Sequence, residues 1–262
     1  MPLTLPEPST TQLVHAPLEQ VVCQVRHDRN LAVADATRAL AVREALGDGY
    51  PHMEEQAQQQ LSFLAGPAGF APLPGGTEQR GWRFRSANGA WTVALLPDFF
   101  ALECTGYTSW TEFRTRLTDL TLAVHEHLHP TLELRLGLRY IDRITRPVVS
   151  TPTAWTGLIH DNLIGPALHP DFRSALSGVQ GVLQMTAEDG GEVLLRHGTQ
   201  PDDSGNWPYL LDTDCYRASS RRFAPDTLLA DAGHLHRLAL QVFQASITPR
   251  LFELLAGREE QT

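Results

Sequence analysis

The stretch Leu132-Glu-Leu-Arg-Leu-Gly-Leu-Arg-Tyr-Ile-Asp-Arg-Ile144 decides how this chain folds. Two sets of residues alternate along it, the apolar Leu132, Leu134, Leu136, Leu138 and Tyr140 and the mostly polar Glu133, Arg135, Gly137, Arg139 and Ile141. Successive side chains of a β-strand point to opposite faces of a sheet, so the alternation predicts a strand with one apolar face. Such strands are typical of antiparallel sheets that helices cover on one side.

The residues before this strand predict a first half of the fold. Strands are expected at 19–26, 82–85, 91–96 and 99–105, and helices at about 30–47 and 109–128. Asn88-Gly89 predicts a type I′ turn between the second and third strands, because both central positions of that turn need a positive φ. Residues 51–80 are polar at first and then rich in glycine and proline, so mostly loop is expected there.

The residues after the central strand predict a second half in the same order. Further strands are expected at 179–186, 192–197 and 209–216, with a weak helix at 155–176 and a long helix from about Asp226 that Pro249 interrupts. We therefore predict an α+β fold with an internal duplication, in which each half reads strand, helix, three strands, helix. The boundaries are a tail at 1–13, a first half at 14–130 and a second half at 131–262.

The amino-acid composition and charge exclude several classes of function. The 262 residues are 42% apolar and 19% charged, as in an ordinary globular protein, and carry a net charge of -9 that disfavours nucleic acid and anionic membranes as partners. All basic residues are arginine, which excludes a Schiff-base or phosphate-loop lysine. Cys23, Cys104 and Cys215 are far apart and are expected to be buried free thiols. No membrane-length apolar run or secretory signal is present, so a cytoplasmic location is expected.

Three short motifs resemble a sporadically distributed prokaryotic family without an assigned function. They are the opening Leu13-Val-His-Ala-Pro-Leu with Val22-Cys-Gln-Val-Arg26, the strand Arg135-Leu-Gly-Leu-Arg-Tyr-Ile-Asp-Arg-Ile144, and Leu210-Leu-Asp-Thr-Asp214. The Arg-Leu-Gly-Leu-Arg-Tyr-Ile segment is the most specific of the three. The resemblance implies an accessory bacterial protein of about this length and implies no reaction.

One motif with possible chemistry is His125-Glu126-His127-Leu128-His129, which fits the H-E-x-x-H pattern of zinc hydrolases. On a continuous helix, His125 and His129 would hold the metal and Glu126 would act as general base. Pro130 follows directly and disfavours helical geometry at His129, so the motif is better explained as the polar last turn of a helix. His234 and His236, two residues apart, are expected to be solvated surface residues.

The polar face of the strands is the leading candidate site. Its charged members that we expect to bind a ligand are Arg83, Arg85, Arg135, Arg139, Asp212 and Asp214. Arginine suits bidentate contact with phosphate or carboxylate. Cross-strand ion pairing, for example between Arg139 and Asp212 or Asp214, is the alternative explanation of the same residues.

We therefore expect a non-catalytic protein that binds a small anionic ligand or a protein partner on a concave, arginine-bearing sheet face. A metal-dependent hydrolase using the histidine motif and a nucleic-acid-binding accessory protein are the alternatives. No cofactor is expected, and no oligomeric state follows from the sequence.

Overall fold

One large antiparallel sheet forms the centre of the computed structural model, which describes residues 1–59, 63–66, 69–72 and 78–258. Its nine strands follow the order β2-β5-β6-β7-β1-β8-β11-β10-β9. Their bounds are β1 Leu18–His27, β2 His52–Gln59, β5 Glu78–Arg85, β6 Trp91–Leu96, β7 Phe99–Cys104, β8 Leu132–Ile144, β9 Val179–Thr186, β10 Glu192–Thr199 and β11 Tyr209–Arg222. A separate pair consists of β3 (Phe63–Gly66) and β4 (Gly69–Pro72).

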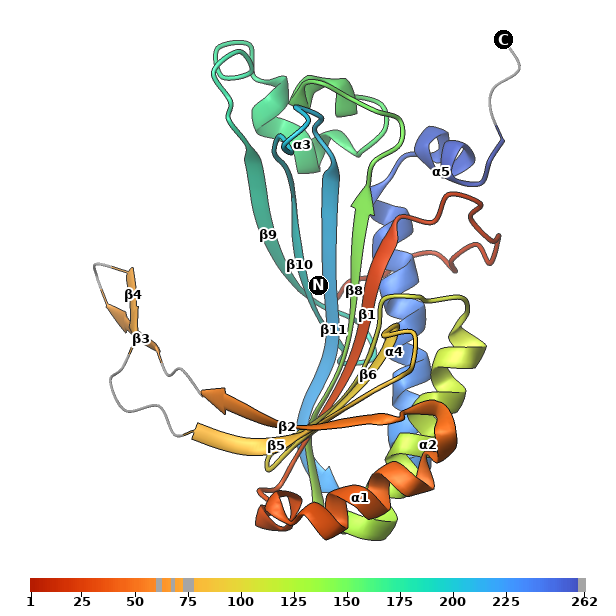
Figure 1. Ribbon diagram of the computed structural model, residues 1–262. Coiled ribbons are helices and arrows are strands. Elements are labelled where there is room, and N and C mark those ends of the chain that lie inside the picture. The colour runs from red at the N-terminus through yellow and green to blue at the C-terminus, as the bar shows by residue number, and fades with distance from the viewer. Residues whose placement is uncertain (60–62, 67–68, 73–77, 259–262) are drawn as a thin grey trace.

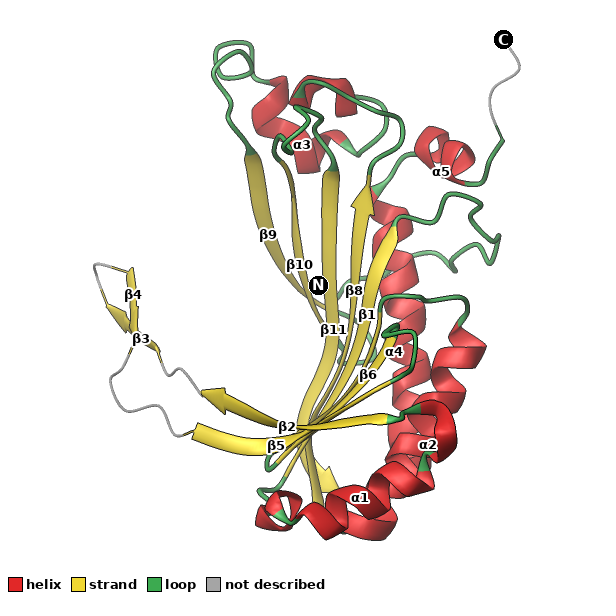
Figure 2. Cartoon of the chain, viewed as in Figure 1, coloured by secondary structure: helices red, strands yellow, loops and turns green. Residues whose placement is uncertain are grey.

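The helices pack on one face of this twisted and curved sheet (Figures 1 and 2). The α-helices are α1 Ala36–Ala45, α2 Trp110–Leu128, α3 Asp161–Leu168, α4 Pro225–Ser246 and α5 Pro249–Leu255, and short 3-10 helices are η1 Leu31–Ala34, η2 Gly47–Gly49 and η3 Pro152–Trp155. The long helices α2 and α4 lie side by side behind the central strands. The chain is therefore an α+β protein with its helices on one side of an antiparallel sheet, as the strand patterns predict.

The strands β1 and β8 pair with each other at the middle of the sheet. The later strands of the first half extend outward from β1, and those of the second half extend outward from β8. The second half follows the predicted order of strand, helix, three strands and helix, whereas the first half has the additional strands β2, β3 and β4. This order suits the internal duplication, which stays a prediction.

Two local expectations for the first half are wrong. Residues 52–59, 63–66, 69–72 and 78–80 are not loop, because they belong to the paired strands β2, β3, β4 and β5; residues 60–62, 67–68 and 73–77 of the predicted loop lie outside the described residues. The turn at Asn88-Gly89 is not type I′, because only Gly89 has a positive φ, of 70°. A bond from Gly89 N to Ser86 O and another from Ser86 N to Trp91 O close a longer loop instead.

The core lies between the sheet and the helices. The predicted stripe of α2, formed by Phe113, Leu117, Leu120 and Val124, is fully buried, and the Ser109 side chain caps the helix by accepting from Glu112 N. Three side chains of β1 face this stripe, and each of them is also fully buried: Val21, Cys23 and Val25. All three cysteines are buried free thiols, as predicted, and burial raises the pKa of the Cys23 thiol to about 12.

The central strand departs from its alternating pattern at its start. Arg26 pairs with Arg135 while His27 pairs with Glu133, so Leu134 is an extra residue on β8 and forms a bulge. The bulge leaves Leu132 and Leu134 exposed and turns Glu133 into the helix side, where Arg221 donates to both its carboxylate oxygens at 2.8 and 3.0 Å. Burial raises the pKa of Glu133 despite this pair. The strand is confirmed, but the expected facing of these three residues is wrong.

Candidate functional site

The sheet has an open face, which we define as the face turned away from α2 and α4 (Figure 1). It carries the residues that alternate with the buried set along each strand. Its arginines are Arg26, Arg83, Arg85, Arg135, Arg139, Arg143 and Arg196, and its carboxylates on the same strands are Glu54, Glu103, Glu192, Asp212 and Asp214. Positive charge therefore gathers on the open face of a chain whose net charge is -9.

Asp212 of β11 is bound by two arginines from the neighbouring strands. Arg139 of β8 donates to both oxygens of the Asp212 carboxylate, from Nε at 2.6 Å and from Nη2 at 2.7 Å, and Arg196 of β10 donates from 3.4 Å on the other side. The Asp212 side chain is 6% exposed, whereas the side chains of Arg139 and Arg196 are 43% and 46% exposed. A buried carboxylate thus orients two arginines whose remaining N–H groups face solvent.

A second ion pair lies beside the first. Arg135 Nη2 donates to Asp214 at 2.8 Å, and its guanidinium lies 4.4 Å from the centre of the Tyr216 ring. The same guanidinium covers Gly137, where an added Cβ would lie 2.3 Å from Arg135 Nη1. Gly137 therefore allows the arginine to lie flat on the sheet, which gives the Arg-Leu-Gly-Leu-Arg segment a structural reason.

A hollow of about 560 Å³ opens next to Asp212. Arg143 and Arg196 line it together with residues of β9 and β10 and with the carboxylates of Asp202, Asp203 and Asp212. Gly198 leaves this part of the hollow without a side chain. A larger residue would not fit there, because its Cβ would lie 2.2 Å from Val179 O. Arg143 is held only loosely, 3.9 Å from Glu19 and 4.0 Å from Asp202. A carboxylate or phosphate in the hollow can bind these two arginines, and only weak ion pairs have to break for this.

The structure brings four of the six predicted site residues together. Arg135, Arg139, Asp212 and Asp214 lie on the adjacent strands β8 and β11, and Arg139 forms with Asp212 the cross-strand ion pair that is the alternative explanation of these residues. Arg83 and Arg85 lie on β5, four strands from β8 in the sheet, which is roughly 19 Å at ~4.8 Å per strand. Arg85 is paired there with Glu54 of β2.

Sequence reasoning missed Arg143 and Arg196. The alternation of side chains along a strand could have predicted both. Arg143 continues the series of Arg135 and Arg139 along β8, and Arg196 alternates with the buried Leu195 and His197 along β10. What no sequence pattern supplied is the order β8-β11-β10, which brings Arg196 to the carboxylate that Arg139 also contacts and places Arg143 at the same hollow.

The histidine motif does not form a metal site. The helix α2 ends at Leu128, and His129 is its C-cap residue with φ 51°, its Nδ1 3.1 Å from the carbonyl oxygen of His125. The side chains of His125 and Glu126 are exposed. Among the described residues, no three histidine, cysteine or carboxylate side chains are placed to hold a metal ion together. A hydrolase that uses these residues therefore gains no support.

His236 is the second histidine that differs from expectation. Its ring stacks on Trp110 at a centroid distance of 4.2 Å, and its Nδ1 lies 2.8 Å from the hydroxyl of Tyr140. Burial, and to a lesser extent Arg237, lowers its pKa to about 4, so the ring is neutral at pH 7. His234 is exposed, as expected. The prediction of a solvated surface residue is correct for His234 and wrong for His236.

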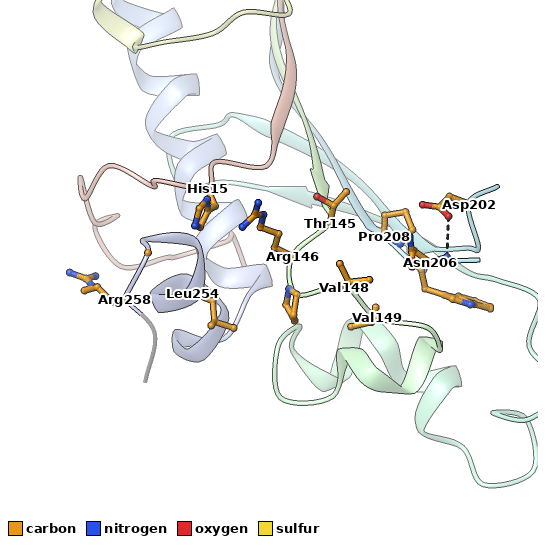
Figure 3. A pocket seen from close by; sticks show the side chains of 13 residues that line it. His15, Thr145, Arg146, Val148, Val149, Asp202, Asn206, Pro208, Leu254 and Arg258 are labelled. Carbon is orange, nitrogen blue, oxygen red and sulfur yellow. Dashed lines mark hydrogen bonds between the residues drawn. The ribbon is translucent and has the colours of Figure 1, made fainter. Parts of the chain in front are cut away.

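A larger hollow, of about 1100 Å³, lies at the end of the sheet near α5 (Figure 3). His15 and Arg146 stand next to each other on one wall, and Val149 lies on the other side; Trp207 is a further lining residue. Arg258 also lines the hollow and pairs with Glu253. No carboxylate among the described residues fixes Arg146, so this hollow lacks the oriented pair of cations that distinguishes the open face.

Comparison with known proteins assigns the chain to no group. No helix in the described part of the chain is both long and apolar enough to cross a bilayer. No protein-family model matches the chain, and no curated protein matches it.

Proposed function

We propose that this chain is a binding protein that holds an anionic group, a carboxylate or a phosphate, in the hollow beside Asp212. The observation that carries the proposal is the buried Asp212 carboxylate, which holds Arg139 and Arg196 in fixed positions at the edge of the open face. Arginines that are already oriented lose little side-chain entropy when they bind an anion. Arg143 supplies a further cation on the same rim.

The anion is carried by a small ligand or by an acidic segment of a protein partner, and both sources offer the same chemistry to the arginines. The hollow is lined by Arg143, Arg196 and three carboxylates, those of Asp202, Asp203 and Asp212. A binding role uses the two arginines as the partners of the anion. Asp212 has both oxygens engaged by Arg139, and Asp202 accepts hydrogen bonds from the amides of Ser204 and Asn206.

Calorimetric titration with inorganic phosphate and with citrate tests the proposal. Arg196→Gln should weaken binding of the better probe by about tenfold or more, because a charge-assisted hydrogen bond is lost. Arg85→Gln is the matched control: its side chain is 48% exposed against 46% for Arg196, it is also paired with a carboxylate, and it should leave binding unchanged. Failure of both probes to bind, or equal loss in the two variants, would contradict the proposal.

Native mass spectrometry of the protein purified without chelator separates the two sources of the anion. A retained mass above that of the polypeptide, absent from Arg196→Gln, identifies a small ligand. A bare polypeptide that still binds citrate or phosphate in the titration points to an acidic segment of a partner protein.

A further inference from the structure

The strand β9 is an open edge of the sheet. It is the last strand in the order and pairs with β10 along its whole length without a register shift. Natural edge strands are usually protected by charged side chains, proline or bulges. The β9 sequence Val179-Gln-Gly-Val-Leu-Gln-Met-Thr186 contains none of these, and it exposes 64% of Val182 and 40% of Leu183. Such an edge is a template for pairing with another strand.

The outward-facing backbone groups of β9 can be identified from the amino-terminal tail. Leu3 N donates to Thr186 O at 2.7 Å, whereas Ala187 N donates back into the hairpin, to Gly191 O. The Thr186 carbonyl therefore points away from β10. Backbone groups of every second residue point the same way, so those of Gln180, Val182 and Gln184 also point outward. In the described part of the chain, only the Thr186 end of this edge receives a strand-like bond from outside.

We propose that two copies of this chain pair through β9, antiparallel, with the two-fold axis at Val182. In this register Val182 faces Val182 of the partner subunit, and Gln180 faces Gln184 of the partner subunit, so that amide groups meet amide groups. On the other face of the strand, Gly181 faces Leu183 of the partner subunit, so that a large side chain covers a glycine. The three outward-facing residues are the ones that form the hydrogen-bonded pairs of this register.

The occupant is a second copy because β9 is complementary to itself. The pattern Gln-x-Val-x-Gln at 180–184 reads the same in both directions, as antiparallel pairing about Val182 requires. The strand carries no charge, so self-pairing brings no like charges together even though each chain has a net charge of -9. The opposite edge, β2, carries Glu54 and Glu55 and lacks both properties. Closed two-fold dimers are also the commonest soluble assemblies.

Pairing would extend the open face across the two copies. Gln180 and Val182 line the hollow beside Asp212, so Gln184 of the partner subunit would stand at its rim. The interface is a short strand edge, smaller than that of a standard stable complex, and a dissociation constant on the order of micromolar is expected. The dimer does not depend on the anion-binding proposal, which concerns Arg196 and Asp212.

Sedimentation velocity between about 1 and 200 µM tests the dimer, because a micromolar complex dissociates across this range. The native chain should shift from monomer to dimer. Val182→Lys and Val182→Glu should each be monomeric throughout, because they place like charges face to face, and their mixture should dimerise again. Val182 is exposed, so neither change threatens folding. Glu55→Lys on the opposite edge should dimerise as the native chain does.

Oxidative cross-linking tests the register. Val182→Cys should form a disulfide-linked dimer, because the two α-carbons of a hydrogen-bonded pair lie ~5.5 Å apart. Gln184→Cys should not, because the two cysteines would be displaced by four residues, ~13 Å. The native cysteines are buried and do not compete. A native chain that stays monomeric, a dimer that survives Val182→Lys, or cysteine variants that cross-link equally would overturn the proposal.

Discussion

Arg139 and Asp212 form a diagonal pair across two neighbouring strands. The residue directly opposite Arg139 in the ladder is Asp214, yet both bonds of the Arg139 guanidinium go to Asp212, and Asp214 pairs with Arg135 instead. The guanidinium thereby reaches the carboxylate that Arg196 also contacts. The buried carboxylate of Asp212 therefore lies between two half-exposed arginine side chains.

Removal of Arg139 should destabilise the fold. Arg139→Gln leaves the Asp212 carboxylate, 6% exposed, with only the 3.4 Å contact to Arg196. A buried charge that loses its partner costs 3–5 kcal/mol in full burial, and partial exposure of Arg139 reduces the expected loss to about 1–3 kcal/mol. Urea unfolding measures it, with Arg26→Gln as the exposed control on the neighbouring strand, for which less than about 0.5 kcal/mol is expected. Equal stability of the two variants would refute the role given to Asp212.

Gly137 should be replaceable only when Arg135 is absent. Alanine at 137 would place its Cβ 2.3 Å from Arg135 Nη1, so the guanidinium must leave Asp214 and the Tyr216 ring. We expect Gly137→Ala to cost about 1–2 kcal/mol, the sum of an ion pair and a cation–π contact.

A double-mutant cycle separates this cause from backbone effects. In the Arg135→Ala background the cost of Gly137→Ala should largely disappear. Gly233→Ala in α4 is the control of opposite sign, because a Cβ there meets nothing within 4 Å and alanine favours a helix by about 0.5–1 kcal/mol. A cost for Gly137→Ala that is the same with and without Arg135 would show that the guanidinium is not the reason.

The period of two along the strands explains why part of the site was predictable. It places Arg135 and Arg139 on one face of β8 and Asp212 and Asp214 on one face of β11, whatever the neighbours of these strands are. It does not specify strand order, which depends on contacts between the halves. Sequence reasoning therefore grouped Arg83 with residues that lie four strands away.

Two other misses have local physical causes. The strand β2 is rich in glutamate and glutamine and lies at an edge of the sheet, so it shows no apolar alternation from which a strand could be predicted. The bulge at Leu134 inserts one residue, which reverses the facing of everything before it, and so Glu133 is buried although it follows the polar series. A bulge depends on the partner strand and has no signal in β8 alone.

Asp142 should make the protein less stable at high pH. It lies on the helix side of β8, and burial alone raises its pKa to about 7 from 3.8. The folded state therefore keeps a proton that the unfolded chain releases, and stability falls as the pH rises from about 4 to about 7. The full cost is roughly 4 kcal/mol, from about three pKa units at ~1.4 kcal/mol each.

Comparison of the native chain with Asp142→Asn isolates this effect from other titrating groups. The free energy of unfolding of the variant, relative to that of the native chain, should rise by about 2–3 kcal/mol between pH 5 and pH 8. Urea unfolding at the two pH values measures it. A relative stability that does not change with pH would mean that Asp142 is ionised in the folded protein.

His236 should have the opposite pH dependence. Its pKa is lowered to about 4 by burial against Trp110 and Tyr140, and the unfolded chain protonates it near pH 6.5. The neutral ring therefore contributes stability above pH 6.5, and this contribution is lost as the pH falls toward 4, up to roughly 3 kcal/mol.

His236→Gln loses the stacked ring and should be less stable than the native chain by about 1 kcal/mol at pH 8. At pH 5 the difference should shrink or reverse, because glutamine takes up no proton. His234→Gln, which changes an exposed residue of the same helix, should alter the free energy of unfolding little at either pH. If His236→Gln is destabilised equally at pH 8 and pH 5, the ring is not held in its neutral form by the Trp110–Tyr140 pocket.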